Sequence, residues 1–166
     1  LQAFQHPILE AHHLTCFIKR DDLLQLETQP GDQAFCGNKW RKLKYNLAAA
    51  HEQGFRILLT FGGAFSNHIA ATASAGKLFG FKTIGIIRGE MVLPLNPTLD
   101  FATTCGMELY FWPREQYRHK DEPHVLAQLQ EQFPQAYILP EGGTNNLALR
   151  GCAELTEEIF AQEQVD

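Results

Sequence analysis

Short apolar runs alternate along the chain with longer segments whose apolar residues recur at helical spacing. The apolar runs predict strands, at 56–63, 82–90, 108–113 and 136–143, with a further short strand beginning at residue 16. The amphipathic segments predict helices, at 38–53, 66–80, 96–106, 122–133 and 146–164. Strands that alternate with helices form βαβ units, so we expect an α/β fold with an open parallel sheet wrapped by helices.

Composition and charge narrow the kinds of partner that the chain can have. With 166 residues, 45% of them hydrophobic, the chain can bury a sizeable core. The net charge of -5 argues against a nucleic-acid partner, and the longest basic stretch is Lys-Trp-Arg-Lys-Leu-Lys at 39–44. The sequence shows no signal-peptide pattern and no apolar run near the ~20 residues of a membrane span. We therefore expect a cytoplasmic protein with no membrane partner.

The cysteines and histidines give no sign of a metal site. The four cysteines lie far apart, at 16, 36, 105 and 152, and form no Cys-x-x-Cys pair, which argues against zinc binding and against a disulfide framework. We expect reduced, mostly buried thiols. The adjacent His12 and His13 face different ways on any regular element, so we expect them at the surface.

Basic residues crowd the start of the helix predicted at 38–53, in the stretch CGNKWRKLKYNL. A helix N-terminus carries about half a positive charge, so cations there are unfavourable and an anion is expected nearby. A solvated, basic helix face is the plain alternative.

A second candidate anion site follows the strand predicted at 56–63. Gly62 and Gly63 end that strand and Ser66 and Asn67 open the next helix, so free backbone N–H groups and small polar side chains converge there. The alternative is that Ser66 is only the helix N-cap. The sequence has no phosphate loop, no dinucleotide fingerprint and no Gly-x-Ser-x-Gly elbow.

Four strings, in this order, resemble one enzyme family: IKRDDLL, GNKWRKLKYNL, FGGAFSNHIAATASAGKLFG and LPEGGTNNLALRG. They resemble the D-cysteine desulfhydrase and 1-aminocyclopropane-1-carboxylate deaminase family. Its members are pyridoxal-phosphate enzymes of fold type II, similar to the β subunit of tryptophan synthase. The likeness runs over nearly the whole chain, which corresponds to about the first half of such an enzyme.

The resemblance implies how the chain would hold pyridoxal 5'-phosphate. Lys39 would form the Schiff base with the cofactor aldehyde and, once released, act as general base. Asn38 and Lys42 would lie near the phosphate, and Asn67 would hydrogen-bond the ring hydroxyl. The cations at the helix start would then be explained by the phosphorylated cofactor that docks there.

The resemblance also implies a place for a small amino-acid substrate. Ser66, with the backbone N–H groups of Asn67 and His68, would hold the substrate carboxylate or approach the reacting carbon. The turn at 142–145, Gly-Gly-Thr-Asn, resembles a turn of the family at the active-site mouth. A plain turn and helix N-cap is the alternative for this segment.

Domains and reaction follow from the same resemblance. Residues 1–52 would be the N-terminal piece of the large cofactor domain, 53–145 the small α/β domain, and 146–166 the start of the return to the large domain, in a chain that is truncated. The expected reaction is α,β-elimination that releases ammonia and an oxo acid, as in a D-cysteine desulfhydrase. The alternatives are 1-aminocyclopropane-1-carboxylate deamination and, in another class, a non-catalytic anion-binding segment. We expect a homodimer in the full-length enzyme.

Overall fold

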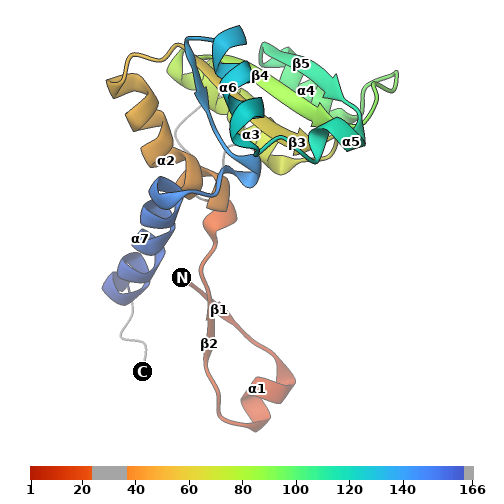
Figure 1. Ribbon diagram of the computed structural model, residues 1–166. Helices are drawn as coiled ribbons and strands as arrows, with labels where there is room; N and C mark the ends of the chain where they lie inside the picture. The colour runs from red at the N-terminus through yellow and green to blue at the C-terminus, as the bar shows by residue number, and fades with distance from the viewer. Residues whose placement is uncertain (24–36, 163–166) are drawn as a thin grey trace.

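A four-stranded parallel sheet forms the centre of the computed structural model, which describes residues 1–23 and 37–162 (Figure 1). The strand order is β5-β4-β3-β6. The strands are β3 (Ile57–Gly63), β4 (Lys82–Arg88), β5 (Met107–Trp112) and β6 (Ala136–Ile138). The predicted α/β fold with an open parallel sheet is confirmed.

Helices follow the strands in the predicted order. They are α2 (Gly37–Glu52), α3 (Asn67–Phe79), α4 (Pro97–Thr104), α5 (Arg114–Tyr117), α6 (Pro123–Gln132) and α7 (Asn146–Gln162). The short α5 was not expected. A 3₁₀ turn, η2 (Glu141–Gly143), links β6 to α7.

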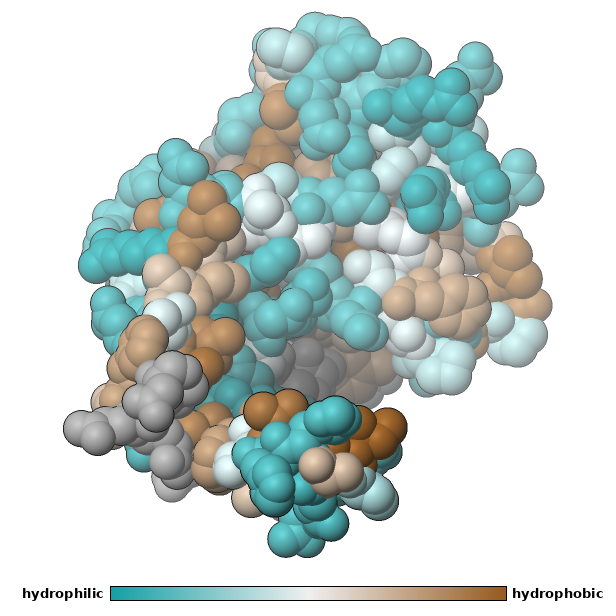
Figure 2. All heavy atoms as spheres, turned by 90° about the horizontal axis from the view of Figure 1, so that it is seen from below, coloured by the Kyte–Doolittle hydropathy of each residue, from teal (hydrophilic) through white to brown (hydrophobic). Residues whose placement is uncertain are grey.

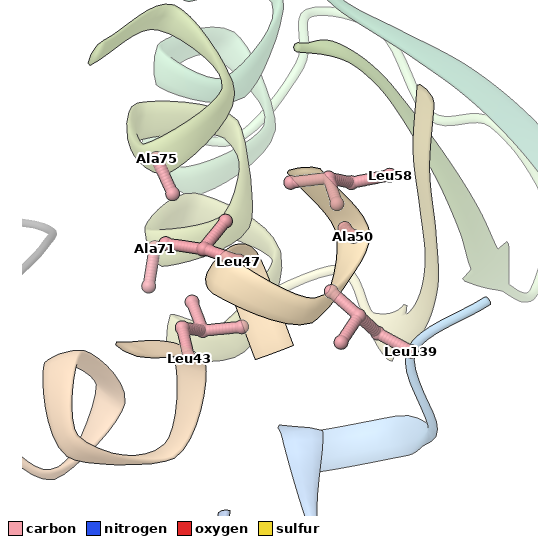
Figure 3. Packing of buried hydrophobic residues seen from close by; sticks show 7 residues of the cluster. All are labelled: Leu43, Leu47, Ala50, Leu58, Ala71, Ala75 and Leu139. Carbon is pink, nitrogen blue, oxygen red and sulfur yellow. The ribbon is translucent and has the colours of Figure 1, made fainter. Parts of the chain in front are cut away.

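Both faces of the sheet are covered because side chains alternate along each strand. On one face, Leu58 of β3 packs with apolar residues of α2 and α3, and Figure 3 shows this cluster: Leu43, Leu47, Ala50, Leu58, Ala71, Ala75 and Leu139. On the other face, Leu59 and Phe61 of β3 pack against Tyr117 of α5 and Leu129 of α6.

The helix α7 packs against α2 and extends below it, away from the sheet (Figure 1). Gly151 of α7 permits this close approach, since a Cβ atom there would lie 2.0 Å from the backbone oxygen of Arg41. The start of α2 is thereby held close to the η2 turn, which directly precedes α7.

The first residues form an arm that extends away from the sheet (Figure 1). Its strands, β1 (Gln2–Phe4) and β2 (Cys16–Ile18), are antiparallel and enclose the helix α1 (Pro7–Ala11). A second 3₁₀ turn, η1 (Asp21–Leu23), follows β2. Seen from below, the molecule shows apolar side chains among the polar ones (Figure 2), and the arm exposes Phe4, Ile8, Leu14, Phe17 and Ile18.

The predicted exposure of two histidines and burial of the cysteines can be compared with the structure. His12 and His13 are exposed, as predicted. The described cysteines, Cys16, Cys105 and Cys152, are each partly exposed, so the prediction of mostly buried thiols is wrong for them. Cys36 lies outside the described residues. Among the helices of the described chain, none is long and apolar enough to cross a membrane.

Candidate active site

The basic residues that open α2 point to two sides of the helix. Arg41 is 3% exposed and its guanidinium donates hydrogen bonds of 2.7–3.0 Å to the carboxylates of Asp21 and Glu158. Three residues further on, Lys44 lies 2.7 Å from a carboxylate oxygen of Glu154 on α7. These two cations therefore serve to bind α2 to its neighbours.

Lys39 and Lys42, also three residues apart, form a second pair on α2. The Lys42 ammonium donates to the Thr144 hydroxyl at 2.8 Å and to the Gly142 carbonyl oxygen at 3.4 Å. Burial lowers the pKa of the Lys39 ammonium, and the nearby charge of Lys42 lowers it further. No carboxylate of the described residues forms an ion pair with either lysine. Lys39 is therefore easier to deprotonate than an ordinary lysine, as a nucleophilic amine requires.

Ser66 caps the first turn of α3. Its backbone is extended, and its hydroxyl oxygen accepts a hydrogen bond of 3.4 Å from the Ile69 backbone N–H. Gly62 lets this turn lie close to the end of β3, because a Cβ atom there would come within 2.8 Å of the Ser66 hydroxyl oxygen and 2.5 Å of Ile69. The predicted N-cap is confirmed, and the backbone N–H groups of the first turn of α3 remain available to an anion.

His68 points into the protein. Its Nε2 lies 2.9 Å from the Thr60 hydroxyl oxygen, and that hydroxyl donates its proton to the carbonyl oxygen of Leu139 at 3.2 Å. Since a hydroxyl has one proton, His68 must donate from Nε2, which leaves Nδ1 as an acceptor. The Nδ1 atom is buried without a hydrogen-bond partner in the described structure.

The imidazole of His68 stays neutral at physiological pH. Burial lowers the pKa of His68 to about 3, and the charges of Lys39 and Lys42 act in the same direction. The helices α2 and α3 are in direct contact, and their starts face a common region of the molecule.

The η2 turn closes this region from a third side. Gly142 and Gly143 both have positive φ angles, of 70° and 71°, which suit glycine. A Cβ atom on Gly143 would lie 2.8 Å from Cε1 of His68, so only glycine lets the turn approach the ring. With the Lys42–Thr144 hydrogen bond, this contact joins the turn at 142–145 to both helix starts.

A pair of asparagines fixes α2 against the start of α7. The side-chain amides of Asn46 and Asn145 donate to each other's oxygens, at 2.7 and 3.2 Å, and the Tyr137 hydroxyl donates to the Asn46 oxygen at 3.2 Å. The Asn145 oxygen also accepts from the Ala148 backbone N–H at 2.9 Å. The segment 142–145 is thus both a helix cap and part of the candidate site.

Sequence reasoning missed part of this arrangement. Asn46 lies four residues after Lys42, so helical spacing alone could have placed it on the same side of α2. Thr60 and Tyr137 carried no signal, because their roles depend on partners far away in the chain. Asn38 and Asn67 are exposed. In the described structure, neither side chain forms a hydrogen bond with Lys39 or Lys42.

Comparison with known proteins finds relatives that are named as enzymes. No family model matches it. It is 35% identical over 151 residues to a Thermotoga maritima protein provisionally named a 1-aminocyclopropane-1-carboxylate deaminase, covering 89% of this chain and 46% of that protein. It is 30% identical to the bifunctional D-cysteine desulfhydrase/1-aminocyclopropane-1-carboxylate deaminase of Arabidopsis thaliana, covering 88% and 37%.

The fold agrees with these relatives. The crystal structure of an ACC deaminase homologue superposes with a TM-score of 0.75 and 27% identity, over 99% of this chain and 48% of that one. The chain thus spans less than half the length of each protein it matches here.

Fold and sequence together point to one class of relatives, the pyridoxal-phosphate-dependent enzymes of fold type II. Within that class, the chain is similar over 88–89% of its length to members of the 1-aminocyclopropane-1-carboxylate deaminase and D-cysteine desulfhydrase family, each of which it covers only in part. The resemblance carried by the four sequence strings is confirmed. The roles of individual residues, and the division at 52 and 145, stay predictions.

The residues around Lys39 fit pyridoxal 5'-phosphate. A half-buried amine with a lowered pKa suits attachment to the cofactor aldehyde, and Lys42 supplies a second positive charge beside it. The buried Nδ1 of His68 is an acceptor without a partner among the described residues. An anionic group near the two lysines agrees with the first two observations, whereas the Nδ1 acceptor calls for a hydrogen-bond donor.

Proposed function

We propose that the whole protein is a pyridoxal-phosphate-dependent lyase that acts on a small amino acid and releases ammonia and an oxo acid. D-cysteine is the first candidate substrate and 1-aminocyclopropane-1-carboxylate the second. The observation that carries the proposal is the half-buried Lys39, whose pKa is lowered and which has no carboxylate partner in the described structure. A non-catalytic anion-binding segment, the alternative, would not need a lysine with a lowered pKa, because a charged ammonium binds an anion better.

Lys39 has two tasks in this proposal. Its amine would bind the cofactor aldehyde and, when the substrate amine replaces it, Nζ would accept the proton from the substrate Cα. Bound pyridoxal phosphate would supply an electron sink that makes this proton loss feasible at neutral pH. Lys42 and Asn38 would hold the phosphate, and Asn67 the ring hydroxyl.

Ser66 would orient the substrate. Its hydroxyl and the backbone N–H groups of Asn67 and His68 stand at the N-terminus of α3, which favours a carboxylate both by hydrogen bonding and by the helix dipole. A fixed carboxylate keeps the Cα–H bond aligned for proton removal, and misplacement by about 1 Å can lower the rate by about a hundredfold.

His68 would stay uncharged beside the two lysines. Its pKa is about 3, so the imidazole carries no positive charge at physiological pH. Its ring would instead support the η2 turn through the close contact with Gly143. Lys39 and Lys42 would therefore supply the positive charge that attracts the cofactor.

The proposal is tested by the release of ammonia, oxo acid and sulfide from the two candidate substrates. Lys39→Ala in the whole protein should abolish all release. Lys44→Ala is the matched control, since Lys44 lies on the same helix but pairs with Glu154. Sulfide from D-cysteine would identify a desulfhydrase, and ammonia from 1-aminocyclopropane-1-carboxylate a deaminase. Full turnover in Lys39→Ala would contradict the proposal, as would an unmodified protein inactive on both substrates.

A further inference from the structure

A polar cavity lies at the carboxyl end of the sheet, apart from the candidate active site. It measures about 470 Å³ and is lined by Arg88, Arg114, Tyr117, Arg118, Lys120 and Glu141. Arg88 is the last residue of β4, and Glu141 belongs to η2. The other four lining residues lie in α5 or shortly after it. Ligands of open parallel sheets bind at this end of the strands.

The cavity and the Ser66 site lie on opposite faces of the sheet. Gly62 and Gly63 are consecutive in β3, so their α-hydrogens point to opposite faces. A Cβ atom on Gly62 would meet Ser66, whereas one on Gly63 would lie 3.4 Å from Nη2 of Arg88. Arg88 pairs with Gly63 in the β3–β4 register and extends toward Tyr117 on the α5 side.

Positive charge in the cavity exceeds negative charge. No described carboxylate forms an ion pair with Arg88, Arg114 or Arg118. The Lys120 ammonium pairs with Asp121 at 2.8 Å and with Glu141 at 3.1 Å. Four cations thus face one lining carboxylate, and guanidinium groups bind carboxylates and phosphates particularly well.

Tyr117 supplies a hydrogen-bond donor beside the Glu141 carboxylate. The residue is 2% exposed, and its buried hydroxyl makes no hydrogen bond of ordinary length to a described residue. Burial raises the pKa of Tyr117, and the charge of Glu141 and a weak hydrogen bond to that carboxylate raise it further, so the hydroxyl keeps its proton at physiological pH. Buried donors without a good acceptor are rare and unfavourable, so an oxyanion in the cavity would compete with Glu141 for this proton.

We propose that this cavity binds an oxyanion, a carboxylate or a phosphate, through the Arg88 guanidinium and the Tyr117 hydroxyl. The flanking Arg114 and Arg118 add attraction, and the Arg88 guanidinium carbon lies 5.9 Å from the centre of the Tyr117 ring. This site is separate from the one around Lys39 and does not depend on the proposed function.

Calorimetric titration of the whole protein with inorganic phosphate, and separately with succinate, tests the site at constant ionic strength. We expect saturable binding of at least one of the two anions, and the one that binds more tightly identifies the ligand class. Arg88→Gln should weaken it by about tenfold or more, as loss of a charge-assisted hydrogen bond does. Arg56→Gln is the matched control, because Arg56 precedes β3 at the opposite end of the sheet.

Tyr117→Phe separates a ligand contact from a structural role. It removes only the hydroxyl, so the ring keeps its packing and the protein should stay folded, while anion binding should weaken by about fivefold or more. Binding unchanged in both Tyr117→Phe and Arg88→Gln would overturn the proposal. Absence of saturable binding to either anion would do the same, as would an equal loss in Arg56→Gln. The part of the binding that Arg88→Gln removes should persist in Lys39→Ala, which keeps this site distinguishable from the one around Lys39.

Discussion

At the residue scale, the environment of each cation on α2 determines its protonation behaviour. Arg41 is buried between two carboxylates, which raise its pKa and keep it charged. Lys39 is half-buried without such a partner, and its pKa is lowered instead. Two basic residues of one helix turn thus differ in role. Arg41 stabilises the packing of α2, whereas Lys39 can more readily lose its proton and act as a neutral amine.

Ser66 offers a prediction in which its two roles separate. Ser66→Ala should lower the free energy of unfolding by about 1 kcal/mol, because the helix cap is lost. Under the proposed function it should also lower turnover by about a hundredfold, because the substrate carboxylate is misplaced. Ser66→Asn keeps a capping side chain without the hydroxyl, so turnover should fall while stability changes by less than about 0.5 kcal/mol. Full turnover in both variants, measured beside urea unfolding, would leave Ser66 as an N-cap only.

At the element scale, the contact between α2 and α7 supports the candidate site. The two helices meet at Gly151, and carboxylates of α7 bind Arg41 and Lys44. This contact fixes the rotation of α2 about its axis, which turns Lys39 and Lys42 away from these carboxylates. The asparagine pair at 46 and 145 adds a second constraint on the same rotation.

Gly151→Ala tests that contact. In an exposed helix position this change would stabilise the protein by about 1 kcal/mol, since alanine favours helix. Here the new methyl group would lie 2.0 Å from the Arg41 carbonyl oxygen, so we expect a loss of about 1–3 kcal/mol instead. Urea unfolding of the variant and the unmodified protein gives the sign of the change in the free energy of unfolding, and a loss would support the close packing of α2 and α7. A gain in stability would show that α2 and α7 do not pack so closely.

Elements with a strong period could be predicted from the sequence, and short ones could not. The buried strands at 57–63 and 82–88 and the helices after them show sustained apolar patterns. The helix α5 has four residues, too few for a helical period to appear, and β1 has three. In the site, Lys39 and Ser66 could be found because motifs carry them. The Thr60–His68 contact and the split of the basic cluster could not, because both depend on residues distant in the chain.

At the scale of the whole molecule, the carboxyl end of the sheet carries both proposed sites. The Gly62–Gly63 pair separates them, because each glycine opens space on its own face of β3. The end of β3 thus leads to Ser66 on one side and to the Arg88 cavity on the other. The N-terminal arm exposes apolar side chains, among them Ile8 and Leu14. The homodimer and the cytoplasmic location stay predictions.

The central claim is that Lys39 is the residue to which pyridoxal phosphate attaches. The most direct test is to incubate the whole protein with the cofactor, reduce it with borohydride, digest it and locate the pyridoxyl group by mass spectrometry. We predict a single labelled peptide that carries the group on Lys39, no label there in Lys39→Ala, and an unchanged label in the Lys44→Ala control. A pyridoxyl group on Lys42, Lys44 or another lysine, or no label at all, would contradict the account.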